Sequence, residues 1–351
     1  MSPNSGFHAP FVPRRTCSKR ETIVPKSAIN ERLKRAYFKY LHHASGRSHK
    51  SLSKDEGALL RFESFFKFAN FGTFSSKQAI EFKTYLGSLG FSVSTFVAEL
   101  RSLRRLLTWL AKTRNFKSSV DLLDIEYLNP AMNECRASQS TSTKVFPSVE
   151  NALTAFRLMP SITVIDRRNR AIFALLSLTG VRGGALITFR VKLFDPARRL
   201  LNQDPKEVAT RFRKQIDTYL FDTGEEFETC FIGWHRYVID DLKYAPDDPL
   251  FPKSIPVKGC AAVGTNVLVP IQHETTQLIS MMVKQSFKRA GLPEFTMHRF
   301  RDMLVGEMYR RKLPAAQLKA WSQNFGHAAL KTSIVSYGRW VQQNCQNGNL
   351  E

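Results

Sequence analysis

The sequence predicts a mainly helical protein of two domains, the second of which also contains a small antiparallel β-sheet. The chain has 351 residues, more than twice the roughly 150 residues of a typical domain. Apolar residues recur every three or four positions through most of it, which is the period of a helix. Around residue 210 they alternate instead, as in a half-buried strand. The segment 134–147 is rich in serine and threonine, so we expect a linker there.

Composition narrows the class of protein. Hydrophobic residues make up 43% of the chain and aromatic residues 11%, which excludes an intrinsically disordered protein. The longest apolar run covers only 171–178, less than half of the roughly 18 residues in a membrane-spanning helix. Lysine and arginine number 52 against 30 acidic residues, a net charge of +22. Such an excess points to a nucleic-acid partner, with a basic ribosomal or membrane-surface protein as the alternative.

The cysteines and the N-terminus indicate the compartment. The five cysteines lie apart without a Cys-x-x-Cys pair, so we interpret them as reduced thiols. The N-terminus has no apolar stretch of the kind found in a signal peptide. We therefore expect an intracellular, cytoplasmic protein.

The N-terminal part is expected to be a basic arm followed by a helical bundle. Residues 1–26 contain four prolines and several basic residues without an apolar period, which is typical of a flexible arm. Helical periodicity starts at residue 27 and continues to about residue 133. The expected start signals of the other three helices are a capping box at Ser53 and Glu56, then Ser75 or Ser76, and then Ser94.

The fourth of these helices is predicted to be amphipathic. Its apolar side consists of Val97, Leu100, Leu103, Leu107 and Leu110. Four basic residues lie mainly off that side: Arg101, Arg104, Arg105 and Lys112. We expect these four cations to bind the phosphates of DNA.

The second domain is expected to cover 148–351 and to mix helices with one sheet. The predicted helices cover 148–159, 167–180, 225–242, 272–290, 298–311 and 314–325. The predicted strands cover 186–194, 207–213 and 215–221. No glycine-rich phosphate loop occurs, and the histidines are not spaced with cysteines as zinc ligands are. We therefore expect no nucleotide or metal cofactor.

Five residues of this domain form a pattern suited to phosphodiester chemistry. Arg182 follows a glycine break, His298 and Arg301 lie three residues apart on one predicted helix, and His327 precedes Tyr337 by ten residues. Arginine forks bind two phosphate oxygens at once and stabilise the charge of a five-coordinate transition state. Histidine can move a proton, and tyrosine supplies an oxygen nucleophile. Each residue alone is more simply a structural one; the set together is not.

The order of these motifs resembles that of the tyrosine recombinase, or phage integrase, family. Thr179-Gly180-Val181-Arg182 resembles its first arginine box, and the series His298, Arg301, Gly326-His327 and Tyr337 resembles its second. The resemblance implies an α+β catalytic domain behind a helical, SAM-like core-binding domain. It also implies a prokaryotic or phage-encoded, nucleoid-associated enzyme that recombines double-stranded DNA and assembles as a homo-tetramer on two sites.

The resemblance also implies roles for single residues. Arg182 and Arg301 would bind the scissile phosphate, with His298 and His327 beside it, and Tyr337 would form a 3′-phosphotyrosyl link. A lysine on a β-hairpin would protonate the leaving 5′-oxygen, for which Lys214 is the best match and Lys206 the rival. The chain departs from the family at Ala185, where many relatives carry an acid, and in a His327–Tyr337 gap that is one residue longer than usual.

Two kinds of alternative remain open at this stage. One is a DNA-binding regulator or architectural protein on the same scaffold without catalysis. The other is a different enzyme: a type IB topoisomerase-like protein that only relaxes strands, or a metal-dependent transposase. The acidic pairs at 240–241 and 247–248 are interpreted as a helix end and a turn rather than as metal ligands.

Overall fold

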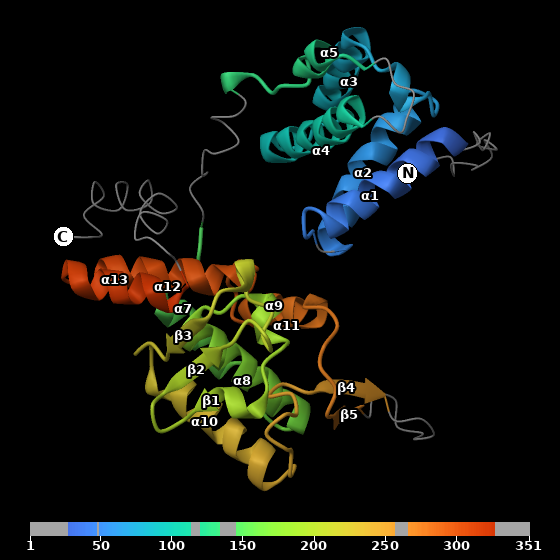
Figure 1. Ribbon diagram of the computed structural model, residues 1–351. Helices are drawn as coiled ribbons and strands as arrows, with labels where there is room; N and C mark the ends of the chain where they lie inside the picture. Colours follow the sequence, from blue (N-terminus) through green and yellow to red (C-terminus); the bar gives the residue numbers. More distant parts are fainter. Residues whose placement is uncertain (1–26, 48, 114–119, 134–144, 257–265, 327–351) are drawn as a thin grey trace, which may run out of the picture. The chain divides into compact units, whose positions relative to one another are not determined.

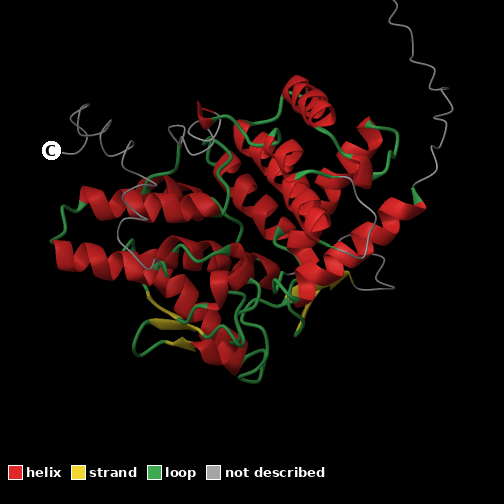
Figure 2. Ribbon diagram, turned by 45° about the horizontal axis from the view of Figure 1, so that its top comes forward, coloured by secondary structure: helices red, strands yellow, loops and turns green. Residues whose placement is uncertain are grey.

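The computed structural model describes residues 27–47, 49–113, 120–133, 145–256 and 266–326. The chain divides into two compact units, Met1–Ser140 and Thr141–Glu351. Helices dominate the described residues of both units, and among these residues strands occur only in the second unit (Figures 1 and 2). The predicted fold class, mainly helical with little antiparallel sheet, is therefore confirmed. Within the described residues, no helix combines the length and the apolar character needed to cross a membrane.

The first unit is a bundle of short helices. They are α1 (Ala28–His43), α2 (His49–Phe65), η1 (Phe71–Thr73), α3 (Ser76–Ser88), α4 (Val93–Lys112) and α5 (Leu122–Glu126). Serine side chains cap three of them, as the sequence suggested in part. Ser27 accepts from the N–H of Asn30, Ser75 forms a capping box with Gln78, and Ser92 accepts from the N–H of Thr95.

Three details of this bundle differ from the sequence prediction. The helix expected to begin at Ser53 begins at His49. Leu52 is buried, so the packed side of the helix includes a residue that precedes the expected cap at Ser53. This packing extends the helix beyond the capping box that the sequence suggested. The fourth helix begins one residue after Ser92, not at Ser94. The short helix α5 was not predicted, because five residues are too few to show a period.

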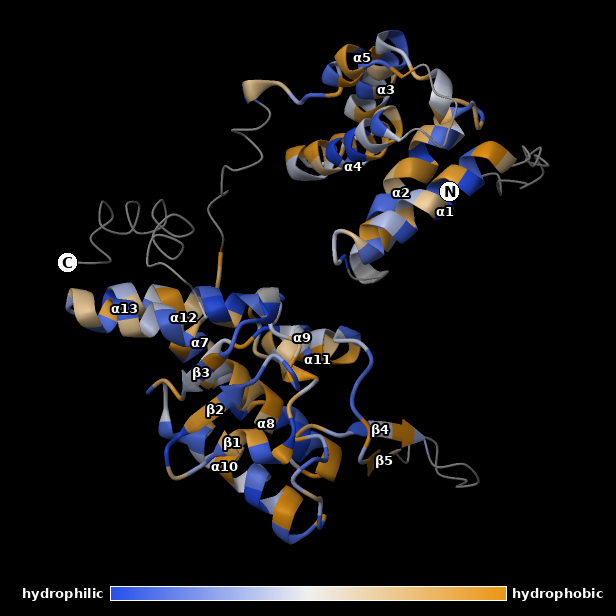
Figure 3. Ribbon diagram, viewed as in Figure 1, coloured by the Kyte–Doolittle hydropathy of each residue, from blue (hydrophilic) through white to orange (hydrophobic). Residues whose placement is uncertain are grey.

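The apolar side of α4 forms the centre of the first unit. Leu100, Leu103 and Leu107 are fully buried there, and in Figure 3 the helix carries hydrophobic and hydrophilic colours side by side. Aromatic rings pack around them; Phe62 of α2 contacts Phe82 of α3 edge to face at a centroid distance of 5.0 Å. The amphipathic pattern read from the sequence is thus the pattern that packs this bundle.

One buried carboxylate ties α4 to α2. Asp55 is only 4% exposed. Its Oδ1 accepts from Ser102 Oγ and from Arg105 Nη2, each at 2.6 Å, and its Oδ2 accepts from Arg47 Nη1 at 2.8 Å. Because a buried carboxylate must be paired, these three donors make Asp55 a structural residue of the first unit.

Asp55→Ala is expected to destabilise this unit by about 2–3 kcal/mol, because Ser102 and two arginines lose a charged acceptor together. Urea unfolding of the full chain measures the change. Glu81→Ala, which removes an exposed carboxylate from α3, is the control and should change the free energy of unfolding little. Equal stabilities for the two variants would contradict the structural role of Asp55.

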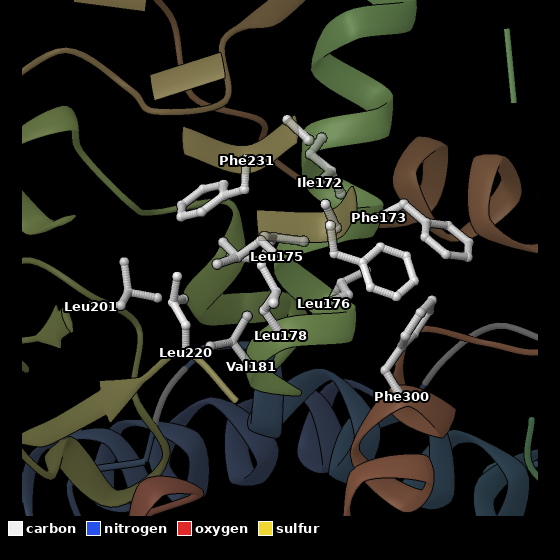
Figure 4. Packing of buried hydrophobic residues seen from close by; sticks show 14 of the residues in the cluster. Ile172, Phe173, Leu175, Leu176, Leu178, Val181, Leu201, Leu220, Phe231 and Phe300 are labelled. Atoms are coloured by element: carbon white, nitrogen blue, oxygen red, sulfur yellow. The ribbon is translucent and has the colours of Figure 1, made fainter. Parts of the chain in front are cut away.

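The second unit contains seven α-helices among the described residues. They are α7 (Val149–Arg157), α8 (Val164–Thr179), α9 (Gly183–Leu186), α10 (Glu225–Asp240), α11 (Gln277–Arg289), α12 (His298–Arg310) and α13 (Ala315–Asn324). The longest apolar run of the sequence lies in α8, where every residue from 171 to 178 is buried. Phe173 and Leu176 of α8 and Phe300 of α12 lie together in this core (Figure 4). Helix α8 is therefore the axis around which the unit packs.

Two small antiparallel sheets lie in this unit, where one was predicted. The first contains β1 (Phe194–Asp195), β2 (Leu200–Gln203) and β3 (Ile216–Tyr219), in that order, with Leu201 paired to Thr218. The second is the hairpin β4 (Lys253–Pro256) and β5 (Asn266–Val269). Pro252 precedes β4 and Pro256 is its last residue. Because proline is uncommon within strands, the sequence pattern did not predict this hairpin.

Two of the three predicted strands are wrong. The stretch 186–194 contains the end of α9, then η2 (Val191–Leu193) and the first residue of β1. The stretch 207–213 is a connection that ends in η3 (Arg211–Arg213). Its alternation is real, since Val208 is buried and Ala209 exposed, but the alternation arises from packing of a loop. The third predicted strand, 215–221, does contain β3.

Candidate active site

The first part of the candidate site is a sharp turn after α8. Gly180 ends this helix in the left-handed conformation, with φ +57°, which glycine adopts without strain. The chain then reverses, and Arg182 occupies the N-cap position of the short helix α9. The guanidinium of Arg182 is therefore carried on a turn whose direction Gly180 sets.

Close packing brings this turn against α12. A Cβ placed on Gly180 would lie 3.0 Å from Leu304 Cδ1 and 3.2 Å from the Cα of Arg301. A side chain there would require Leu304 and the backbone of α12 to shift by a few tenths of an ångström, in addition to the strain of the positive φ. One residue past Arg182, a Cβ on Gly183 would lie 3.0 Å from Cε of Met297, the residue before His298. Two predicted site segments, more than 100 residues apart in sequence, are thus in contact.

Arg301 is fixed by backbone carbonyls from two helix ends. Its side chain is buried, with 5% exposure. Nη1 donates to the carbonyl of Gly180 at 3.2 Å, Nη2 donates to the carbonyl of Phe325, and the guanidinium lies 4.7 Å from the centroid of the Phe325 ring. Since both carbonyls belong to helix ends, the guanidinium plane is set by the turn after α8 and the end of α13.

His298 is the first residue of α12 and is exposed. Arg301 follows three residues later on the same helix, so the helix contains the predicted spacing. The two side chains differ in burial, because His298 is exposed and Arg301 is buried. The N-terminus of a helix carries a partial positive charge and favours anions. His298 and the start of α12 therefore add to a site whose arginines already favour a phosphate.

The connection between β2 and β3, residues 204–215, supplies further cations; we call it the β2–β3 loop. Lys214 is exposed at its end, two residues before β3 begins. Lys206 is also exposed and lies near its start, where its N–H bonds to Asp204 Oδ1 at 2.8 Å. Lys214 lines a hollow of about 480 Å³ together with Gly326 and side chains of β3 and α13.

The end of α13 is clamped onto β3. Asn324 accepts from the N–H of Tyr219 at 2.7 Å and donates to the carbonyl of Tyr219 at 2.8 Å, so its amide completes the edge of the strand. Gly326 has φ +70°, and a Cβ there would lie 2.9 Å from Ile216 Cγ1. This clamp sets where the chain leaves α13, beside Lys214 and Arg301. His327 follows directly, but His327 and Tyr337 lie outside the described residues.

Sequence reasoning missed the residues that hold this arrangement. Asn324 and Phe325 orient β3 and Arg301 through backbone carbonyls and an amide, and neither residue type signals such a role in sequence. Their only signal is adjacency to the Gly326-His327 motif. Ala185, where an acid was expected from the family pattern, is buried in the core of the unit at 1% exposure, so this position contributes packing and no charge.

The electrostatics of the site are strongly positive. Burial lowers the pKa of Arg182 below its ordinary value, and the nearby charge of Arg211 in the β2–β3 loop lowers it further. Two cations near each other in a partly buried place destabilise one another. Within the described part of the chain, no group of three His, Cys, Asp or Glu side chains is arranged to hold a metal ion.

The four cations predicted on α4 differ in their environment. Arg101, Arg104 and Lys112 are exposed. Arg105 is only partly exposed and donates to Asp55 at 2.6 Å and to Ser102 Oγ at 3.1 Å. Its charge is therefore compensated within the bundle, while the other three are presented to solvent.

Solved structures with a similar fold are recombinases and integrases. A lambda integrase dimer bound to a COC′ core site has a TM-score of 0.60 at 13% identity, covering 90% of this chain and 79% of that one. XerH site-specific recombinase in a post-cleavage complex with a palindromic difH substrate has a TM-score of 0.57 at 15% identity, covering 90% and 84%. The Tn1549 transposon integrase bound to transposon right-end DNA has a TM-score of 0.52 at 15% identity, covering 86% and 93%.

These likenesses concern the fold. No protein-family model and no curated protein sequence matches the chain. The chain has the tyrosine recombinase fold over most of its length, as the order of its motifs had implied.

Proposed function

We propose that this chain, which has the tyrosine recombinase fold, is a site-specific DNA recombinase that cleaves and rejoins strands through a covalent phosphotyrosyl intermediate. One observation carries the proposal. Arg301 donates to the carbonyls of Gly180, two residues before Arg182, and of Phe325, and Lys214 lines a hollow with Gly326. The segments that carry three predicted site residues thus meet at the end of α13, after which His327 and Tyr337 follow in the sequence. A protein that only binds DNA has no need of the tyrosine that completes this series.

The arginines are suited to stabilise the transition state of phosphoryl transfer. When an oxygen attacks the phosphorus, charge accumulates on the non-bridging oxygens, and guanidinium N–H groups are matched to them in geometry. The carbonyls of Gly180 and Phe325 already fix Arg301, so it needs little reorganisation during the reaction. His298, at the start of α12, would donate a further hydrogen bond to the same phosphate.

Tyr337 would supply the nucleophile. Its phenolic oxygen forms a bond to phosphorus, the bond to the 5′-oxygen breaks, and the 3′-phosphate remains linked to the protein. The phenolic proton would pass to His327 or to solvent. Attack by a 5′-hydroxyl from another strand reverses these steps and releases Tyr337. The bond energy is kept in the phosphotyrosyl link, so the exchange requires neither a metal nor a nucleotide.

Lys214 would act as the general acid toward the leaving 5′-oxygen. It borders the hollow beside Gly326, whereas Lys206 lies eight residues earlier at the far end of the β2–β3 loop. Lysine can release a proton, while the guanidinium of Arg211 hardly can.

Affinity for duplex DNA would come from both units. The exposed Arg101, Arg104 and Lys112 on α4 would neutralise phosphates in the first unit, with Arg105 oriented by Asp55. Strand exchange needs two sites held together, which a tetramer of this chain would provide.

Trapping the covalent intermediate tests this function. DNA that flanks its gene is fragmented, nicked with DNase and incubated with the protein in a chelator. Where a nick lies close to the cleavage point, the short released strand diffuses away and cleavage cannot be reversed. We expect DNA linked to protein that survives denaturant, and sequencing of that DNA gives the site.

Each other outcome points to an alternative. Binding without any adduct would refute the proposal and favour a catalytically silent DNA-binding regulator. Adducts with relaxation of supercoils but without recombinant products between two captured sites would favour a type IB topoisomerase-like enzyme. Cleavage that requires a divalent metal would favour a metal-dependent transposase.

A further inference from the structure

The β2–β3 loop is fastened to the segment that carries Arg182. The N–H of Ala209 donates to Thr188 Oγ1 at 3.0 Å. The carbonyl of Ala209 lies 3.7 Å from the position of a Cβ on Gly184. Gly184 lies in α9, Thr188 lies two residues after the end of this helix, and Arg182 is its N-cap residue. The loop residue two positions after Ala209, Arg211, is therefore held near Arg182 by backbone contacts.

Ion pairs also hold the first half of the same loop, through Glu207. Glu207 lies 3.0 Å from Lys192 Nζ and 3.6 Å from Arg190 Nε. Lys192 also pairs with Asp247 at 2.7 Å, and these partners raise the pKa of Lys192. Four charged groups thus tie the loop to η2 and to the segment before β4.

This attachment brings one exposed arginine close to a second, partly buried one. Arg211 is exposed in η3, and it acts on Arg182 as a like charge. Bringing two guanidinium groups together costs energy in the unliganded protein. The cost becomes a gain when a phosphodiester lies between or beside them, because each then has an opposite charge to bind. Charged groups whose pKa values are shifted by like charges are common at binding sites.

We infer that Arg211 is a third phosphate-binding arginine of the cleavage site. It would contact the scissile phosphate or the phosphate next to it, from the loop that also carries Lys214. The inference rests on the proposed function for the identity of the anion, a DNA phosphodiester. It assigns to Arg211 a role in binding and positioning DNA and not in proton transfer.

The first test measures binding and does not depend on cleavage. The affinity of the full chain for a duplex from the DNA flanking its gene is measured as a function of salt. Loss of one phosphate contact lowers the slope of log affinity against log salt by about 0.9, so Arg211→Ala should show this change. Arg198→Ala, which removes an exposed arginine from the β1–β2 turn, should leave the slope near that of the unchanged protein.

The second test locates the phosphate. Single methylphosphonates, which carry no charge, replace the scissile phosphate or either neighbour in nicked duplexes. Arg211→Ala should slow adduct formation roughly 10- to 100-fold on unmodified DNA, and Arg211→Lys should restore part of the rate. On the duplex in which the contacted phosphate is neutral, the unchanged protein and Arg211→Ala should react at similar rates.

The outcomes separate this inference from the proposed function. If Arg211→Ala matches Arg198→Ala in salt slope, Arg211 binds no phosphate, whether or not adducts form. If the slope falls as expected but the unchanged protein forms no adduct, the phosphate contact stands and the recombinase proposal fails.

Discussion

Arg182→Ala is expected to lower the rate of adduct formation by roughly two to three orders of magnitude, while the free energy of unfolding stays the same or rises. The rate falls because a donor to the transition state is lost. Stability does not fall, because the variant removes a half-buried guanidinium that is close to Arg211, and such repulsion is typical of functional sites. Single-turnover adduct rates and urea unfolding of the same preparations measure the two effects.

Arg301→Ala provides the contrast. Arg301 joins the carbonyls of Gly180 and Phe325, so its loss should reduce both the rate and the stability. If Arg182→Ala instead destabilises the chain and leaves the rate of the folded fraction unchanged, Arg182 is a structural residue and the candidate site is wrong.

The second large effect concerns Lys214. Lys214→Ala should slow cleavage of ordinary DNA by roughly two to four orders of magnitude, the usual contribution of a general acid. A substrate with sulfur in place of the 5′-oxygen has a leaving group that needs no proton, so the variant should regain most of its rate on it. Rates of adduct formation on matched oxygen and sulfur substrates provide the measurement.

Lys206→Ala is the matched control for this experiment. Both lysines are exposed in the β2–β3 loop, so the two variants change the charge of the loop equally. If the sulfur substrate rescues Lys206→Ala and not Lys214→Ala, the general acid is Lys206. If it rescues neither, the proton comes from outside this loop.

The sequence predicted those parts of the fold that depend on local periodicity. The apolar stripe of α4 and the apolar run of α8 led to helices that the structure contains. Helix α4 buries one continuous side, and α8 is buried on all sides from 171 to 178. The glycine break at Gly180 could also be read, since a helix followed by glycine and a reversal is a local pattern.

The contacts that assemble the site could not be read in this way. The fit of Gly180 against α12, the amide of Asn324 on β3 and the hold of Thr188 on Ala209 join residues that are far apart in sequence. Each uses backbone groups or the absence of a side chain, which composition does not reveal. Residues 207–213 of the β2–β3 loop were predicted to be a strand for a different reason. Val208 is buried in the loop between more exposed neighbours, and this alternation is also the pattern of a strand.

The central claim is tested most directly by identifying the residue that bears the DNA. Adducts trapped on the nicked substrate are digested, and the peptide linked to DNA is sequenced by mass spectrometry. The account predicts a link to Tyr337, and it predicts that Tyr337→Phe abolishes the adduct while binding persists. Tyr309→Phe, which removes the hydroxyl of a partly buried tyrosine on α12, should form the adduct normally. An adduct that forms in Tyr337→Phe, or a link to any other residue, would contradict the account.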